Sequence, residues 1–394
     1  MSKSTIIVVG AGVFGVTAAI ALQKRGHAVS LFDPGPLPHP LAASTDISKA
    51  VRMDYGPDED YMAWMEAALD GWRRWNQDWP EPLFHEDGVT YLTRSPMAPG
   101  GFEHESYQLL LKRRHKPERL GSAEIRRRFP AWSTGGYVDG YYNPEGGYAE
   151  SGKVVARLIE IAQGAGVTLM AGQKFARLAM RETGARVQGI VNAEGQVFQA
   201  DWVVVAAGSW TPHALPFMAE HLRSVGQPVF HLKPADPAPY QAKVFPTFGA
   251  DISNTGYYGF PANREGIVKI ANHGVGRQMH PESPERAVTA EQEAHLRAFL
   301  RGTFPALSDA PIVYTRVCLY CDTWDEHLWI ARDPERQGLV VATGDSGHGF
   351  KFAPALGDVI ADAVEGADNP LLRKFRWRPE VKPARGEEAA RYHG

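Results

Sequence analysis

The sequence predicts an α/β fold: a Rossmann-type domain of interrupted topology that binds a dinucleotide, plus an α+β domain built on a large mixed or antiparallel sheet. Three observations lead to this prediction. A glycine-rich turn joins an apolar strand to a helix within residues 4–33. Two further apolar strands, at 202–207 and 339–343, follow much later. Between them, residues 225–330 alternate with period two, which is typical of a separate sheet with one buried face.

The first element is the apolar run Ile6–Val9, as expected of a parallel strand buried on both faces. Gly10, Gly12 and Gly15 then form a G-x-G-x-x-G turn. These glycines permit a tight turn, close approach of the backbone to a pyrophosphate, and close packing of helix on strand. A helix is predicted over 16–24, ending at Gly26. The alternative is an ordinary glycine turn.

Asp33 ends the second predicted strand, which covers residues 28–32. A carboxylate there can accept hydrogen bonds from ribose hydroxyls and would repel a 2′-phosphate, so FAD or NAD is favoured over NADP. The alternative is an acid in a surface turn before Pro34. The late strand, loop and helix at 339–364 favour FAD, because a simple nicotinamide dehydrogenase does not need them.

The remaining elements complete this organisation. Residues 34–48 are rich in Pro, Gly, Ser and Ala and predict a long loop over a cleft. Helices are predicted over 60–76, 153–163, 289–300 and 353–364. The expected FAD-binding domain comprises residues 1–80, 151–224 and 326–378, the substrate domain comprises 81–150 and 225–325, and 379–394 form an extended or frayed tail.

Composition narrows the classes of protein. The chain has 394 residues, of which 44% are hydrophobic and 22% charged, as in ordinary globular proteins. Its net charge of −3 favours neither nucleic acid nor an anionic membrane as a partner, and we expect neither. No apolar run approaches the ~20 residues of a spanning helix, and the first is too short for a secretory signal, so we expect a cytoplasmic protein. Two cysteines, Cys318 and Cys321, exclude a disulfide framework and a four-thiolate zinc site, and no metal is expected.

Five stretches of the sequence resemble the flavoprotein family of monomeric sarcosine oxidase, fructosyl amino acid oxidases (amadoriases), N-methyltryptophan oxidase and pipecolate oxidase. They are the glycine turn, TDISKAVR at 45–52, YYGFP at 257–261, VCLY at 317–320 and SGHGFK at 346–351. The resemblance extends from residue 8 to about 365. It implies oxidation of a secondary amine that bears a carboxylate, with oxygen reduced to hydrogen peroxide by a monomeric enzyme.

The resemblance also implies FAD held by a thioether from Cys318 to its 8α-methyl group. From the residues alone, Cys318 and Cys321 could instead be small apolar fillers or a C-x-x-C redox pair, although that pair favours a helix N-terminus. Cys321 has no predicted role. The predicted cofactor-binding residues are Gly10, Gly12, Val13, Phe14, Gly15, Asp33, Ser44, Thr45, Lys49, Ala207, Gly208, Trp210, Cys318, Gly347, His348, Gly349 and Lys351.

Arg52 and Lys351 match the pair that binds the substrate carboxylate in the resembled family. Arg offers a bidentate fork and Lys a point charge, which together would hold an anion in one orientation. The alternatives are a structural salt bridge for Arg52 and a solvated lysine at 351. Lys49 and Tyr320 are also predicted to contact substrate. Sarcosine-specific members have Arg where this chain has Lys49, and amadoriases have Lys, which favours bulkier N-substituted amino acids.

Lys269 lies within an apolar strand pattern, where a buried ammonium needs a partner. It resembles the family lysine near flavin N5 that promotes the reaction with oxygen. The alternative is a lysine that points outward from an edge strand. His273 and Tyr258 match positions on the substrate side and are predicted to assist catalysis. Without the resemblance, both would be assigned to core packing.

Two rival functions stay open from the sequence. One is a dehydrogenase of the same fold that passes electrons to an acceptor other than oxygen. The other is a dinucleotide-binding protein without turnover.

Overall fold

The computed structural model describes residues 3–132, 136–181, 185–382 and 391–392. Its first sheet has six strands in the order β20-β21-β13-β1-β2-β9. All neighbours are parallel except β20 and β21, which are antiparallel. The strands are β1 (Thr5–Val9), β2 (Ala28–Asp33), β9 (Thr168–Ala171), β13 (Trp202–Val205), β20 (Trp329–Arg332) and β21 (Leu339–Thr343).

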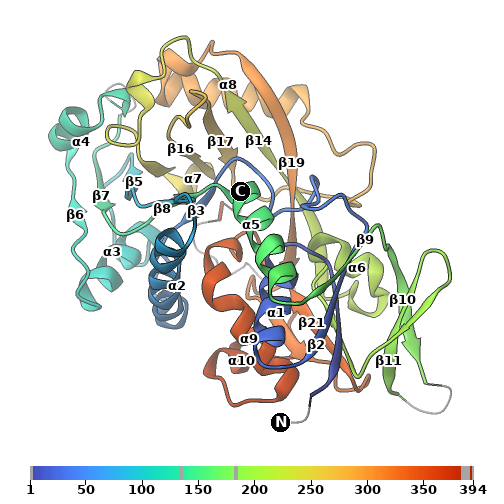
Figure 1. Ribbon diagram of the computed structural model, residues 1–394. Coiled ribbons are helices and arrows are strands. Elements are labelled where there is room, and N and C mark those ends of the chain that lie inside the picture. The colour runs from blue at the N-terminus through green and yellow to red at the C-terminus, as the bar shows by residue number, and fades with distance from the viewer. Residues whose placement is uncertain (1–2, 133–135, 182–184, 383–390, 393–394) are drawn as a thin grey trace.

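Two helices lie side by side on this sheet, α1 (Val13–Lys24) and α9 (Ala353–Glu365), although they come from opposite ends of the chain (Figure 1). A Cβ at Gly357 would lie 2.2 Å from the Thr17 carbonyl oxygen, so the two helices are in backbone contact. Next to them pack α2 (Glu59–Asp78) and α5 (Ser151–Gly164). The main hydrophobic core fills the space between these helices and the sheet.

The second sheet is mixed and has nine strands, in the order β18-β14-β17-β16-β15-β5-β7-β6, with β19 paired to β14. Its pairs are antiparallel except β15 with β5. The long strands β14 and β19 rise from beside the first sheet into the second (Figure 1). The strands are β5 (Val89–Thr93), β6 (Glu118–Arg119), β7 (Asp139–Asn143), β14 (Leu222–Leu232), β15 (Thr247–Ala250), β16 (Tyr257–Phe260), β17 (Val268–Asn272), β18 (Arg277–Gln278) and β19 (Ile312–Thr323).

Smaller elements complete the fold. One three-stranded sheet consists of β3 (Lys49–Val51), β8 (Gly147–Ala149) and β4 (Phe84–His85), and another of β10 (Phe175–Met180), β11 (Val187–Asn192) and β12 (Val197–Gln199). Helix α8 (Ala290–Thr303) packs its apolar face on the second sheet. The remaining helices are α3 (Phe102–Lys112), α4 (Ser122–Arg128), α6 (Thr211–Ala214), α7 (Ile252–Thr255) and α10 (Pro370–Lys374).

This architecture confirms the predicted fold class, and two local expectations are corrected. Helix α1 begins at Val13 rather than at residue 16. It starts directly after Gly12, and its first backbone amides therefore lie at the glycine turn, where a helix N-terminus can bind an anion. Gly26 follows the C-cap Arg25 with φ +92°, as expected of a C′ residue. The expectation of a frayed tail is wrong for Arg391, which is only 5% exposed because it is paired with buried acids.

Within the part of the chain that the structure describes, no helix is both long enough and apolar enough to cross a membrane.

Candidate active site

A cavity of about 160 Å³ opens where β1, β2 and β13 end. Strand β1 lies between β2 and β13, so the chain leaves the sheet in two directions at this point, where open α/β sheets bind ligands. The cavity is lined by many of the predicted cofactor-binding residues, namely Gly10, Gly12, Val13, Phe14, Asp33, Ser44, Lys49, Ala207, Gly208, Trp210 and Gly347.

The glycine turn has the geometry that a dinucleotide site requires. Gly10 has φ +100°, and a Cβ there would lie 2.5 Å from the Ala206 carbonyl oxygen. Gly15 does not line the cavity, but a Cβ on it would lie 1.7 Å from the Gly10 carbonyl oxygen, so it allows the helix to pack on the turn. Gly349 packs against Phe14, with a Cβ position 2.8 Å from its ring.

Asp33 holds the turn in place through its carboxylate. Its two oxygens accept hydrogen bonds from the amides of Ala11, at 2.8 Å, and Gly35, at 2.9 Å. A carboxylate has about four acceptor positions, so it can still accept from a ribose hydroxyl. Ser44 reaches the turn from the following loop, where its hydroxyl accepts from the Val13 amide at 3.0 Å. These residues fit FAD.

The two cysteines lie on opposite faces of β19, which argues against a C-x-x-C redox pair. Cys321 is buried in the apolar cluster beneath the first sheet, and burial raises the pKa of its thiol to about 12. Cys318 packs instead with Tyr320, Tyr258 and the loop residue Ala43. Neither Cys318 nor Thr45 lines the cavity.

Lys49 lies between Cys318 and the dinucleotide cavity: it lines the cavity, and its Nζ is 3.5 Å from the Sγ of Cys318. Burial lowers the pKa of Lys49, but the nearby Cys318, Tyr258 and Asp46 outweigh this effect and raise it overall. The lysine therefore stays protonated beside the thiol.

A second cavity of about 60 Å³ adjoins the first, since Lys49, Tyr320, Gly347 and Phe350 line both. It brings together the residues predicted to contact substrate or to lie on the substrate side, namely Lys49, Arg52, Tyr258, His273, Tyr320 and Lys351, but not Lys269, which was predicted to serve the reaction with oxygen. His348, predicted as a cofactor residue, also lines this cavity. Aromatic side chains form much of the remaining wall, namely Tyr91, Phe248, Phe260 and Phe350.

Arg52 and Lys351 both lie close to the Tyr55 ring. The guanidinium carbon of Arg52 is 5.2 Å from the centre of the Tyr55 ring, and the Nζ of Lys351 is 4.8 Å from it. Arg52 donates to the Asp54 carbonyl, and Lys351 donates to the Tyr55 hydroxyl at 2.8 Å. The sequence analysis missed Tyr55, and its position three residues after Arg52 was the available signal. Two buried cations thus face one small cavity.

His348 links Lys351 to a distant turn. Its Nε2 lies 2.9 Å from the Glu326 carbonyl oxygen, which can only accept, so Nε2 carries a hydrogen. In the neutral ring Nδ1 then accepts from the Tyr55 hydroxyl, at 3.0 Å. The Tyr55 oxygen in turn accepts from Lys351. This order of donors and acceptors fixes the direction in which Lys351 donates.

Lys269 is buried in the middle of the second sheet, because β17 lies between β14 and β16. The alternative of an outward-pointing lysine on an edge strand is therefore wrong. Its Nζ forms an ion pair with Asp46 at 2.7 Å and also donates to the Ser48 carbonyl. Burial lowers the pKa of Lys269 to about 8, against the opposing effect of Asp46.

Asp46 is a second residue that the sequence analysis missed. Its other oxygen lies 3.1 Å from Nε2 of the buried His231. The pKa of Asp46 is lowered well below its usual value, since Lys269 and His231 outweigh the opposing effect of burial. Lys269 lines neither cavity; its carboxylate partner belongs to the loop that leads into Lys49.

Tyr258 and His273 meet at the cavity wall, with ring centres 6.4 Å apart. Burial raises the pKa of Tyr258, so its hydroxyl stays protonated near neutral pH and can donate but not act as a phenolate base.

Residues 5–363 match the family model described as FAD dependent oxidoreductase. The chain belongs to this family. Its predicted family and enzyme class are thereby confirmed, and FAD is the cofactor that the family implies. The roles of individual site residues remain predictions.

Individual proteins of known activity are similar to this chain over nearly its whole length. Monomeric sarcosine oxidase from Bacillus sp. (strain B-0618) is 27% identical over 385 residues, covering 96% of each chain. N-methyl-L-tryptophan oxidase from Salmonella dublin is 26% identical, covering 95% of this chain and 98% of the relative. The crystal structure of the fructosamine oxidase Amadoriase II from Aspergillus fumigatus has a TM-score of 0.84 and 25% identity, covering 100% of this chain and 94% of that one.

Proposed function

We propose that the protein oxidises the C–N bond of a small secondary amine bearing a carboxylate, such as an N-methyl amino acid. The product is an imine that hydrolyses, and oxygen is reduced to hydrogen peroxide. The observation that carries this proposal is the pair Arg52 and Lys351, two buried cations that line a small cavity adjoining the dinucleotide cavity. The named activities of the relatives are of the same kind.

The cavity volume favours a small substrate. One water molecule needs about 10–15 Å³ of such space, so a cavity of about 60 Å³ accommodates about four to six non-hydrogen atoms. This is the size of sarcosine and is much smaller than a fructosyl amino acid. Lys49, which is shared in kind with amadoriases, favours the larger substrate. Fructosyl amino acids are therefore the second candidate class.

The side chains divide the work of the amine half-reaction. Arg52 and Lys351 bind the carboxylate and so fix the orientation of the amine, which must be a free base to react. Tyr258, on β16, and His273, directly after the neighbouring strand β17, contact the rest of the substrate and can hold or donate a proton. The aromatic wall excludes water. When bound, FAD supplies the acceptor for a hydride equivalent.

A separate charge serves the oxygen half-reaction in this proposal. A buried ammonium stabilises negative charge that develops on oxygen, and Lys269 is such a group, kept in place by Asp46. The rival is a dehydrogenase with another acceptor. Covalent attachment of FAD through Cys318 also belongs to the proposal, and it is supported by the position of Sγ 3.5 Å from Nζ of Lys49, a residue that lines the dinucleotide cavity. The cytoplasmic location and the monomeric state remain predictions.

The test is a hydrogen peroxide assay of the purified FAD-bound protein with sarcosine, longer N-methyl amino acids, pipecolate and fructosyl amino acids. We expect peroxide, with the highest kcat/KM for the small N-methyl amino acids. Fastest turnover of a fructosyl amino acid would overturn the argument from cavity volume. Reduction of an artificial dye without peroxide would identify a dehydrogenase, and no turnover with any acceptor would identify a binding protein.

A further inference from the structure

We propose that Arg391 is a positioning residue for the substrate cavity: its guanidinium joins the turn between β19 and β20 to the end of β17 and thereby orders the group that binds carboxylates. This inference deepens the proposed function and rests on it for the role of Arg52 and Lys351 in binding a carboxylate.

Arg391 makes three directed contacts from a buried position. One nitrogen lies 2.8 Å from the Asp322 carboxylate, a second lies 3.1 Å from the Glu326 carboxylate, and Nε donates to the Gly274 carbonyl at 3.1 Å. Both carboxylates are themselves buried. The guanidinium carbon is 5.8 Å from the centre of the Tyr320 ring, which lines both cavities. The planar guanidinium of Arg391 reaches these three acceptors from three separate nitrogens, whereas a lysine ammonium would have to reach them from a single nitrogen.

The two ion pairs hold a turn that carries backbone strain. Glu326 has φ +58°, in the left-handed region that residues other than glycine rarely adopt. Such a conformation persists only when surrounding contacts determine it. Arg391 provides a contact of this kind, because it binds the Glu326 side chain on one side and Asp322, at the end of β19, on the other.

The strained residue is connected to the carboxylate-binding group. The Glu326 carbonyl accepts the hydrogen bond from His348, which accepts from Tyr55, which accepts from Lys351. A shift of this turn therefore moves the hydrogen-bond chain that directs the Lys351 ammonium. The arginine acts at the far end of that chain and does not itself line the cavity.

A second connection runs from the same place to His273. Arg391 binds the carbonyl of the next residue, Gly274, and the Tyr392 amide donates to the His273 carbonyl at 2.9 Å. The His273 ring lies 5.6 Å from the Tyr320 ring, so Arg391 lies behind the wall that these two side chains form. Residues 391–392 thus connect β19, through Asp322, with the segment directly after β17, through His273 and Gly274.

The test compares Arg391→Gln, Arg391→Lys and the matched control Arg376→Gln, which changes an exposed arginine paired only with Glu380 among the contacts seen. The probe is acetate, a carboxylate that the enzyme cannot oxidise, and its Kd is read from the change in flavin absorbance. We expect Arg391→Gln to raise this Kd at least tenfold, Arg391→Lys to raise it less, and the control to match the native protein. Acetate binding needs no turnover, so its result stands apart from the peroxide assay.

The oxygen step separates positioning from general damage. Arg391 contacts neither Lys269 nor Asp46, so the rate constant for reoxidation of the reduced protein by oxygen should stay within twofold of native. An unchanged acetate Kd, or an equal loss in both measurements, would overturn the proposal. If Arg391→Gln fails to retain FAD, Glu326→Gln decides the question, because it keeps the Asp322 pair. It must raise the acetate Kd and leave reoxidation unchanged, or the proposal is wrong.

Discussion

At the scale of single residues, each buried cation of the site has hydrogen-bonding partners that set its direction. Lys351 donates to Tyr55 and to the His348 carbonyl, whereas Lys269 is neutralised by Asp46. Arg52 donates to the carbonyl of Asp54. Burial raises the pKa of the Asp54 carboxyl, although the Tyr141 hydroxyl donates to this carboxyl at 2.6 Å and opposes the shift. Because their partners differ, the buried cations of the site are not equivalent, and we expect each to have its own role.

Arg52→Ala should remove about 2–5 kcal/mol of transition-state stabilisation, because one member of a buried charge-assisted pair is lost. The measurement is kcat/KM for an N-methyl amino acid and for a secondary amine without a carboxylate. We expect the loss to be confined largely to the first substrate. Equal losses on both would indicate that Arg52 is structural.

Cys318→Ala should release FAD into the supernatant after acid denaturation, while Cys321→Ala and the native protein should keep the flavin with the polypeptide. The reason is that only Cys318 faces Tyr258 and Tyr320 at the site, and Cys321 lies on the opposite face of the strand. The absorbance of the supernatant measures this. Free flavin from the native protein would refute covalent attachment.

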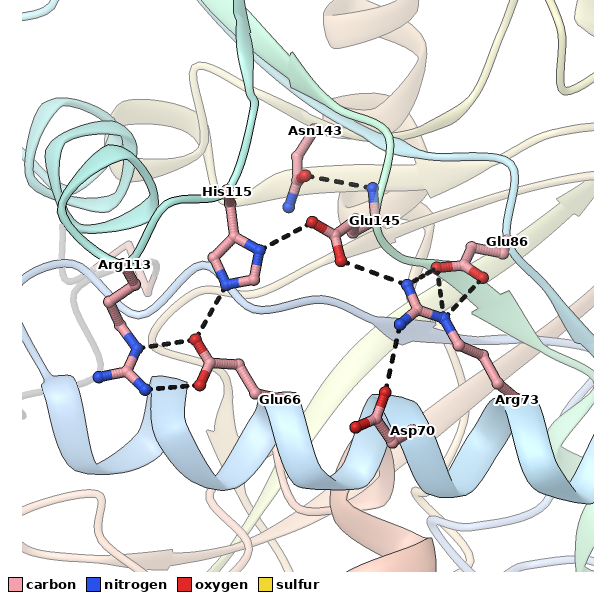
Figure 2. A network of polar contacts seen from close by, with 8 residues as sticks. All are labelled: Glu66, Asp70, Arg73, Glu86, Arg113, His115, Asn143 and Glu145. Carbon is pink, nitrogen blue, oxygen red and sulfur yellow. Dashed lines mark hydrogen bonds and ion pairs between the residues drawn. The ribbon is translucent and has the colours of Figure 1, made fainter.

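At the scale of elements, packing and polar contacts fix how helices are placed around the site. The first turn of α1 lines the dinucleotide cavity, and the close contact of α1 with α9 holds it there. This contact depends on Gly357, which has no side chain to separate the two helices. On the other side, α2 carries Glu66, Asp70 and Arg73 into a network with His115 and Glu145 (Figure 2). That network ties α2 to the segment after α3 and to the turn between β7 and β8.

Gly357→Ala should destabilise the protein by about 1–3 kcal/mol, as inserting a methyl group into close backbone contact usually does. Its Cβ would lie 2.2 Å from the Thr17 carbonyl oxygen. Gly164→Ala, at the end of α5, is the matched control, since nothing lies within 4 Å of its Cβ position. Chemical denaturation measures both. Equal stability of the two variants would contradict the tight helix contact.

The His115 network should make stability depend on pH. Burial lowers the pKa of His115, but Glu66 and Glu145 outweigh this effect and raise it above its unfolded value of about 6.5. The contribution is therefore fully present below about pH 6.5 and is lost as pH rises through the folded pKa. Thermal unfolding of native protein and His115→Gln should differ more at pH 6 than at pH 9. The same difference at both values would contradict the prediction.

At the scale of the whole molecule, the sequence predicted what neighbouring residues determine. The glycine turn and Asp33 act through local backbone geometry, so their spacing was sufficient to predict a dinucleotide site, whereas the late strand and helix at 339–364 were needed to favour FAD over NAD. Pairings between distant segments were not visible, and the Asp46–Lys269 and Arg391–Asp322 ion pairs are examples. Arg391 lies in a polar stretch without periodicity, so only the folded chain reveals its partners.

The site contains two separate groups of positive charge. Arg52 and Lys351 face the substrate cavity, whereas Lys269 lines neither cavity and is paired with Asp46 behind Lys49. The groups that influence the Lys269 ammonium are Asp46, Lys49 and Cys318. Because burial lowers its pKa to about 8, its charge, and with it the rate of the oxygen step, should fall as pH rises past that value.

The most direct measurement of this division is anaerobic stopped-flow spectroscopy of Lys269→Met, which removes the charge but keeps most of the side-chain volume. Amine is mixed with the oxidised protein first, and the reduced protein is then mixed with oxygen. We predict reduction close to the native rate and reoxidation slowed by about a hundredfold or more, equivalent to about 3 kcal/mol, without the native dependence on pH. Slow reduction with native reoxidation would contradict the assignment and move Lys269 to the amine site.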